Sequence, residues 1–252
     1  MTDYEGVAQS GAYERRYEDG RYVATTRAIS EFVGAAPRVL EVGCGTGHFL
    51  AALAGRDAVG LDASAGMLAR ARARLPDARL IRGRAEALPF ASAAFDRVLI
   101  VNALHHFAAP EAVLAGVRRV LHDAGAVMIV GLDPSLGADR WPVYDWFEGT
   151  LARDRARFPS AASLRTSLTK AGFARASTVS VETFAEVVPA REALASGALA
   201  KHTTSQLSDL DDAAYCAGLA RIAQAARVAE ASGSVLRLET HLTLHATYGW
   251  SL

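Results

Sequence analysis

The chain has 252 residues, of which 51% are hydrophobic, enough for one large domain or for a domain with a cap. Lysine and arginine together number 27, as do aspartate and glutamate, so no net charge draws the protein to nucleic acid or to an anionic membrane surface. A polar start, two isolated cysteines and the lack of a long apolar stretch predict a cytoplasmic protein with no disulfide, no membrane segment and no nucleic-acid partner.

Strand and helix signals alternate along the chain. This alternation is typical of an α/β fold in which a mostly parallel sheet carries helices on both faces. Strands are predicted at 38–42, 57–61, 79–82, 95–101, 124–131 and 173–181, and helices at 22–34, 48–54, 64–74, 110–121 and 160–171.

The C-terminal part departs from this alternation. Between the sixth strand and a final strand at 235–247 lie about fifty residues, far more than a hairpin loop uses. Helical runs at 189–199 and 209–231 indicate a helical cap, inserted at about 183–232 over the ligand-binding edge of the sheet. We expect a single domain for the whole chain, with this cap as an insertion.

The segment 39–47 joins an apolar run to three glycines at alternate positions. Gly43, Gly45 and Gly47 stand at a predicted strand-to-helix junction, where nucleotide-like ligands bind and where glycine lets the backbone approach them closely. The spacing Gly-x-Gly-x-Gly differs from the dinucleotide fingerprint Gly-x-Gly-x-x-Gly, and no Gly-Lys-Ser/Thr follows, which excludes a P-loop.

Two acids define the ligand further. Glu41 lies two residues before the first glycine, where a carboxylate repels a pyrophosphate but suits a ligand with ammonium and sulfonium charges. Asp62 ends the second strand about twenty residues after that glycine, where an acid is placed to accept both hydroxyls of a ribose. An alternative is that Asp62 caps the helix that begins near Ser64.

With these motifs the chain resembles the class I S-adenosylmethionine-dependent methyltransferases, in particular the small-molecule branch related to quinone biosynthesis. The resemblance implies a Rossmann-like, seven-stranded sheet with an antiparallel last strand, S-adenosylmethionine as the cofactor and a small-molecule acceptor. The matching segments cover about 35–135 in consistent order: 41–47, 61–64 with 67–68, 84–90, 95–96 leading to 102–107, and 117–121 before Gly125.

The resemblance also implies how the cofactor is held. Ala85 and Glu86 would meet the amino group and a ring nitrogen of the adenine, while Met67 packs either on the adenine or only in the core. Cys44 is expected to be a small apolar neighbour rather than a nucleophile, since nothing basic lies near it. The expected cofactor-binding residues are Tyr22, Glu41, Gly43, Cys44, Gly45, Gly47, Asp62, Ala63, Met67, Ala85, Glu86 and Asn102.

Catalytic residues are harder to predict, because a sulfonium methyl group is already activated and a base is needed only when the acceptor must lose a proton early. His105 and His106 follow the fourth strand, at the edge where cofactor and acceptor should meet. They are our candidate general bases, with a structural role as the alternative. Adjacent positions on an extended chain diverge, so at most one of them should face the methyl group.

Aromatic residues indicate the acceptor pocket. The N-terminal segment 1–25 is rich in tyrosine and arginine, and in related enzymes such a segment closes over the cofactor as a lid; a solvated terminus is the alternative. Large rings at 141–147 follow the fifth strand and indicate either core packing or the wall of a pocket for an apolar or aromatic acceptor. The expected pocket residues are Tyr17, Asp133, Trp141 and Tyr144.

We therefore predict methyl transfer from S-adenosylmethionine to a small-molecule acceptor. Two alternatives stay open: a catalyst that uses the bound cofactor for a non-methyl reaction, such as a cyclisation or rearrangement, and a regulatory subunit that binds it without turnover. No metal is expected, because Thr243 separates His241 from His245 and no third ligand stands at a suitable spacing. A homodimer is allowed for, although no residue indicates one.

Overall fold

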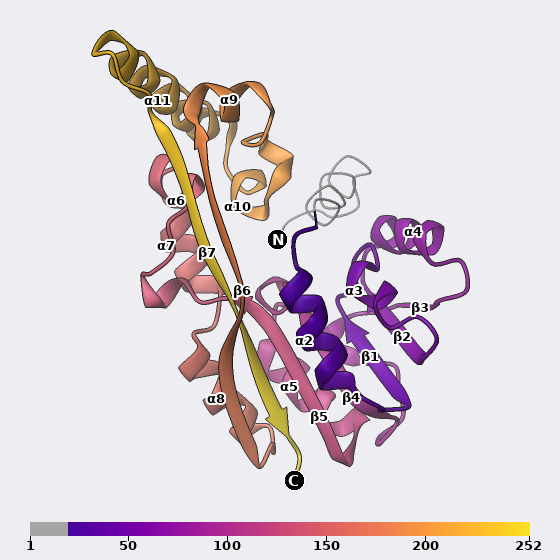
Figure 1. Ribbon diagram of the computed structural model, residues 1–252. Coiled ribbons are helices and arrows are strands. Elements are labelled where there is room, and N and C mark those ends of the chain that lie inside the picture. Colours follow the sequence, from indigo (N-terminus) through magenta and orange to yellow (C-terminus); the bar gives the residue numbers. More distant parts are fainter. Residues whose placement is uncertain (1–19) are drawn as a thin grey trace.

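The computed structural model describes residues 20–252 (Figure 1). Its strands are β1 (Arg38–Val42), β2 (Asp57–Asp62), β3 (Arg79–Arg82), β4 (Phe95–Val101), β5 (Leu121–Leu132), β6 (Arg175–Pro189) and β7 (Arg237–Trp250). They form one seven-stranded sheet in the order β3-β2-β1-β4-β5-β7-β6. Neighbouring strands are parallel except for β7, which runs antiparallel to both β5 and β6. The predicted fold, mostly parallel with an antiparallel last strand, is confirmed.

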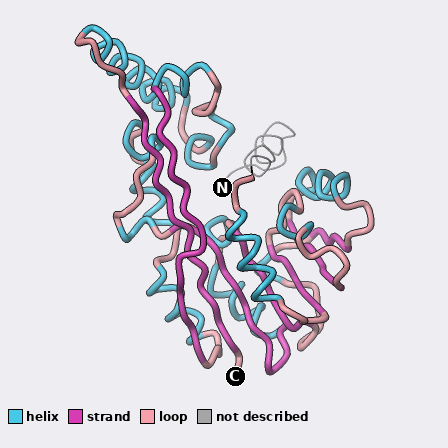
Figure 2. The backbone as a smooth tube through the Cα atoms, viewed as in Figure 1, coloured by secondary structure: helices cyan, strands magenta, loops and turns pink. Residues whose placement is uncertain are grey.

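Helices cover both faces of the sheet, because its central strands are apolar on both sides. In β4, Val98 and Ile100 belong to one buried cluster, and Leu99 and Val101 belong to the other. The helices α5 (Pro110–Val120) and α8 (Ala161–Lys170) pack into the first cluster, and α2 (Val23–Val33) and α3 (His48–Ala51) pack into the second. Figure 2 shows these helices as cyan turns beside the magenta strands.

Strands β6 and β7 form a long hairpin that extends beyond the rest of the sheet (Figure 1). Residues 244–250 of β7 pair with β5, whereas the pairing with β6 continues out to Pro189 and Arg237. The sixth strand therefore continues past the predicted end at residue 181, and residues 183–189, counted in the predicted insertion, belong to this strand. The first inserted helix begins at residue 190, close to the helical run predicted at 189–199. The glutamates of this segment hid the rest of the strand from the sequence prediction, because they interrupt its apolar pattern. Phe184 and Val188 nevertheless keep the alternation of a half-buried strand.

The helical cap sits at the far end of this hairpin. Its inserted helices are α9 (Ala190–Ala195), α10 (Ser205–Ser208) and α11 (Asp212–Ala231), and α6 (Pro142–Trp146) joins them from the segment after β5. A third buried cluster holds these parts together and includes Phe147 and Ile222. At Gly218 of α11 a Cβ atom would lie 2.3 Å from the Phe147 ring, so this helix needs a glycine there in order to pack.

Candidate functional site

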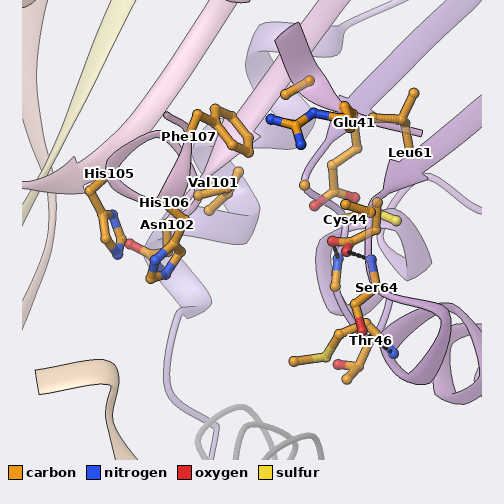
Figure 3. A pocket seen from close by; sticks show the side chains of 18 of the residues that line it. Glu41, Cys44, Thr46, Leu61, Ser64, Val101, Asn102, His105, His106 and Phe107 are labelled. Carbon is orange, nitrogen blue, oxygen red and sulfur yellow. Dashed lines mark hydrogen bonds between the residues drawn. The ribbon is translucent and has the colours of Figure 1, made fainter. Parts of the chain in front are cut away.

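A cavity of about 590 Å³ opens at the carboxyl edge of β1, β2 and β4, where these parallel strands end. Figure 3 shows Glu41 and Cys44 on one side of it and His105 and His106 on the other. The structure brings together most of the residues predicted to bind the cofactor. Those that line the cavity are Glu41, Gly43, Cys44, Gly45, Asp62, Ala63, Met67, Ala85, Glu86 and Asn102.

Two residues expected at the cofactor lie elsewhere. Gly47, with φ of 77°, precedes α3, and a Cβ atom there would lie 3.3 Å from Ala71 in α4 (Ala65–Arg74), so this glycine serves helix packing. Tyr22 is 3% exposed and packs edge-on against Phe49 and Phe184 in the core of the sheet. The lid predicted for segment 1–25 lies mostly outside the described residues and stays a prediction, while the aromatic neighbours of Tyr22 come from distant parts of the chain.

The glycine loop folds tightly against the end of β2. The backbone N–H groups of Gly43 and Cys44 both donate to the carbonyl oxygen of Leu61, at 2.7 and 3.0 Å. Gly43 has φ of 74°, in the left-handed region, and a Cβ atom there would lie 2.6 Å from Cβ of Ala103. Glycine is therefore required at this position by both the backbone conformation and the contact across the loop.

Glu41 is a buried carboxylic acid at the floor of this cavity. Glu41 is 2% exposed, and its Oε2 atom has no hydrogen-bond partner among residues 20–252. Burial, together with the nearby charge of Asp62, raises the pKa of Glu41 from 4.5 to about 8. An orphaned buried acceptor beside a cavity fits a ligand that brings a positively charged N–H donor, as the ammonium group of S-adenosylmethionine would.

We expect the free energy of unfolding to fall as the pH rises from about 5 to about 8, because of Glu41. The pKa of this group is 4.5 when unperturbed and about 8 in the folded protein, so in this interval only the folded state keeps the proton, and the advantage is lost as the pH rises. Glu41→Gln should lack this part of the pH dependence. Denaturant unfolding of both proteins at several pH values measures it, and parallel stability curves for the two would contradict the assignment.

Asp62 connects the glycine loop to the start of α4. Its Oδ2 atom accepts a hydrogen bond from the Gly45 N–H, and its Oδ1 atom accepts one from the Ser64 N–H, both at 2.9 Å. Ser64 itself caps the helix, since its Oγ atom accepts from the Met67 N–H at 3.2 Å. The capping role considered for Asp62 therefore belongs to Ser64. Each carboxylate oxygen can accept a second hydrogen bond, so Asp62 can shape the loop and still bind a ligand hydroxyl.

The residues expected at the adenine lie on a short 3₁₀ turn, η1 (Ala85–Ala87). The Ala108 N–H donates to Oε1 of Glu86 at 3.0 Å, and Nε of Arg84 lies 3.5 Å from its Oε2. These contacts hold Glu86 at the cavity wall, beside the buried Ala85. Cys44 is buried nearby, and burial with the negative charges of Glu41 and Asp62 raises the pKa of its thiol, consistent with an apolar neighbour rather than a nucleophile.

His105 and His106 both line the cavity, contrary to the expectation that they diverge. They lie in a 3₁₀ turn, η2 (Leu104–His106), instead of an extended strand end, and their ring centroids are 3.9 Å apart. The turn follows Asn102, whose φ of 51° puts a left-handed bend in the backbone after the end of β4. The ring of His105 also stacks on Phe158, with centroids 3.8 Å apart and planes at 19°.

A second cavity, of about 260 Å³, adjoins the first and shares Asn102 and His105 with it. It lies between the β6–β7 hairpin and the cap. Trp141 lines it as predicted for an acceptor pocket, and so does Tyr22. Tyr17 lies outside the described residues.

Asp133 and Tyr144, also expected in the acceptor pocket, line neither of these two cavities. Asp133 is 4% exposed and accepts hydrogen bonds from the Ser135 N–H at 3.1 Å and the Ala161 N–H at 2.7 Å, which fix the turn after Asp133 and the start of α8. The hydroxyl group of Tyr144 donates to Oδ2 of the buried Asp154 at 2.7 Å. Both were predicted from their position after β5, but each is used to hold the local backbone or the cap.

Sequence reasoning missed several residues of the site. Arg157, at the end of α7 (Thr150–Arg157), and Asp209, after α10, line the first cavity, with Nη1 and Oδ2 3.4 Å apart. Neither belongs to a motif, and only the fold of the cap brings them to the cavity. Among residues 20–252 no three His, Cys, Asp or Glu side chains gather as a metal site would need, and the absence of a metal stays a prediction.

Comparison with known proteins agrees with this geometry. The family model of a methyltransferase domain matches residues 40–129. An uncharacterised methyltransferase of Synechocystis is 36% identical over 140 residues, which are 54% of this chain and 66% of that protein. A demethylmenaquinone methyltransferase of Renibacterium salmoninarum is 40% identical over 119 residues, 45% of this chain and 50% of that protein. The chain thus spans about half to two thirds of the length of these relatives.

The fold has counterparts among solved structures. A structure described as a methyltransferase from an antibiotic biosynthesis pathway of Anabaena variabilis superposes with a TM-score of 0.69 and 19% identity, over 90% of this chain and 96% of that one. At this identity the likeness concerns the fold alone. The sheet order, the glycine loop with its two acids and the matched domain agree, and the chain belongs to the class I S-adenosylmethionine-dependent methyltransferases.

Proposed function

We propose that the protein transfers the methyl group of S-adenosylmethionine to a small-molecule acceptor. The observation that carries this proposal is the meeting of two cavities at Asn102 and His105, the first with Glu41 at its floor, whose Oε2 atom has no hydrogen-bond partner among residues 20–252. One cavity suits the cofactor and the other an acceptor, so the reacting groups would meet where the cavities join.

In the cofactor cavity each residue has a distinct part. Glu41 supplies a buried acceptor for the ammonium group, Asp62 accepts from the ribose hydroxyls, and the turn at Ala85 and Glu86 meets the adenine edge. S-adenosylmethionine, when bound, supplies a methyl group that its sulfonium already activates. The chain itself has to orient the acceptor and exclude water, and the buried residues around both cavities support this task.

A base is available at the junction if the acceptor must lose a proton. The rings of His105 and His106 lie together on the cofactor cavity, and His105 also borders the acceptor cavity. The nitrogen of a neutral imidazole can accept a proton near neutral pH, whereas a tyrosine would first have to ionise. His105 is therefore the first candidate for the base, and His106 is the second.

The alternatives considered from the sequence are not favoured. The matched family and the relatives are methyltransferases by name, which supports methyl transfer over a cyclisation or a regulatory role. No helix in the described part of the chain is long and apolar enough to span a membrane. We also infer a cytoplasmic protein that acts without nucleic acid, and a homodimer stays a prediction.

The direct test is incubation of the protein with S-adenosylmethionine labelled in its methyl group and with fractionated cell extract. Transfer of the label to a small molecule, with release of S-adenosylhomocysteine, is the expected result. Binding of the cofactor without label transfer to any fraction would favour the regulatory alternative. Conversion of a small molecule without label in the product would favour the non-methyl reaction.

We expect Asp62→Ala to weaken S-adenosylmethionine binding by roughly 1.5–3 kcal/mol, because charge-assisted hydrogen bonds to the ribose are lost. Asp57→Ala is a matched control, since Asp57 begins the same strand, at the opposite edge of the sheet, where it pairs with Arg79 at 2.7 Å. Isothermal calorimetry measures both affinities, with circular dichroism to check the fold. An unchanged affinity in a folded Asp62→Ala protein would refute the assignment.

A further inference from the structure

The second cavity has a lining that selects its occupant. From it we propose that the acceptor is an uncharged, largely apolar molecule that presents a carbonyl or hydroxyl oxygen to Thr204 and Gln206. This inference deepens the proposed methyl transfer and rests on it for the role of the occupant. Its evidence is separate, however, because it comes from the second cavity and from the cap, not from the cofactor motifs.

One wall of this cavity is mostly apolar and comes from the β6–β7 hairpin. Leu238, Thr240, Leu242 and Leu244 are alternate residues on one face of β7, and all four line the cavity. In the register of the hairpin, Phe184 lies opposite Leu242 and Val188 lies opposite Leu238, and both also line the cavity. Trp141 and Leu199 extend this surface, so the apolar part of a ligand would be stabilised by burial against it.

Two charged side chains of the described residues line this cavity, those of Arg21 and Glu186. Nη2 of Arg21 lies 3.1 Å from Oε2 of Glu186, and their side chains are 46% and 48% exposed. The opposite charges of Arg21 and Glu186 neutralise each other, and about half of each side chain is exposed to solvent. A charged acceptor would leave water for an apolar cavity with no opposite charge to meet it, which disfavours its binding.

The opposite wall carries two buried hydrogen-bond donors. Thr204 is 8% exposed, and its Oγ1 atom accepts from the Leu207 N–H at 3.2 Å, which leaves its hydroxyl proton to donate. Gln206 is 7% exposed, and its Nε2 atom donates to Oδ2 of Asp154 at 2.7 Å, which leaves a second N–H. No acceptor for either hydrogen is found among residues 20–252.

The hydrogen bond to Asp154 fixes the orientation of the side-chain amide of Gln206. Asp154 is 1% exposed and also accepts from Nε of Arg157 at 2.8 Å, so the carboxylate that holds Gln206 is itself held. A pre-positioned donor left without an acceptor costs free energy in a buried site, and an oxygen atom of the bound molecule would remove that cost. The apolar wall and these donors together define a neutral molecule with an apolar body and an accepting oxygen.

The test is the binding of three naphthalene probes that differ only in one substituent. They are 2-acetylnaphthalene, which is neutral with a carbonyl oxygen, 2-ethylnaphthalene, which has no oxygen, and 2-naphthoate, which is an anion. Calorimetry on the full chain, loaded with S-adenosylhomocysteine, gives each affinity without any turnover. We expect the ketone to bind at least about fivefold more tightly than the hydrocarbon and more than tenfold more tightly than the anion.

Two variants test the donors. Thr204→Val and Gln206→Met should each reduce the preference for the ketone over the hydrocarbon to about twofold or less. Thr204→Ser is the matched control, because it keeps the hydroxyl and the cap of α10 and should keep the preference. The preference is a ratio, so a general loosening of the cap, which weakens both probes, does not imitate the loss of a donor.

The outcomes separate this inference from the proposed function. Equal binding of ketone and hydrocarbon, tighter binding of the anion, or a preference that survives both donor variants would overturn the inference, whatever the activity. Preferential binding of the ketone with no methyl transfer to any acceptor would overturn the proposed function and leave the inference intact. Methyl transfer to a charged acceptor held in this cavity would do the reverse.

Discussion

Gly43→Ala should lower the affinity for S-adenosylmethionine by at least about a hundredfold. The residue has φ of 74°, which an L-residue adopts only with strain, and the new Cβ atom would lie 2.6 Å from Cβ of Ala103 and 3.2 Å from the Phe107 ring. Ala103 stands directly before the η2 turn, so a shift that relieves this contact also moves His105. The variant should therefore lose cofactor binding and disturb the junction between the cavities. Calorimetric titration with the cofactor measures the first effect.

Gly55→Ala is the control that separates the effect of backbone strain from that of the steric contact with Ala103. Gly55 has φ of 84°, but a Cβ atom there meets nothing within 4 Å. This control should lose some stability through backbone strain and keep its cofactor affinity. If Gly43→Ala binds the cofactor as the wild type does, the glycine loop does not contact the ligand in the way proposed. If both variants lose cofactor binding equally, backbone strain, and not the contact between residue 43 and Ala103, explains the loss.

Turnover with a confirmed acceptor should fall by about a hundredfold or more in His105→Ala when the acceptor has to lose a proton. His105 borders both cavities and its ring is held by stacking on Phe158, so it is placed to receive a proton from a molecule in the second cavity. His106→Ala should have the smaller effect, because His106 lines the cofactor cavity only. Cofactor affinity should stay within about twofold of the wild type in both.

The matched control is His202→Ala, a cap histidine that is exposed and lines neither cavity. It should keep full turnover. Steady-state rates, measured alongside cofactor affinity, decide the question for all three variants. Near-full turnover of both His105→Ala and His106→Ala would mean that alignment and exclusion of water carry the reaction, and that the two histidines are structural.

The sequence by itself determined the sheet and the cofactor half of the site. Apolar strands buried on both faces, separated by amphipathic helices, produce local signals that are read without knowing which segments meet. The glycine loop and Asp62 belong to the same kind of signal, because parallel strands bring their carboxyl ends to one edge of the sheet. Glu41, Gly43 and Asp62 accordingly line one cavity, in the places that the motif spacing indicated.

The tertiary structure alone decided the acceptor half. The second cavity exists because β6 continues to Pro189 and carries the cap outward on a hairpin, so that Leu242 of one strand, Trp141 from after β5 and Gln206 of the insertion come to face one space. Asp133 and Tyr144 follow β5 as Trp141 does, yet they serve the structure, because Asp133 accepts a hydrogen bond from the first residue of α8 and Tyr144 donates one to Asp154. Such contacts join residues far apart in the chain, and no local pattern specifies which partner a buried polar group will find.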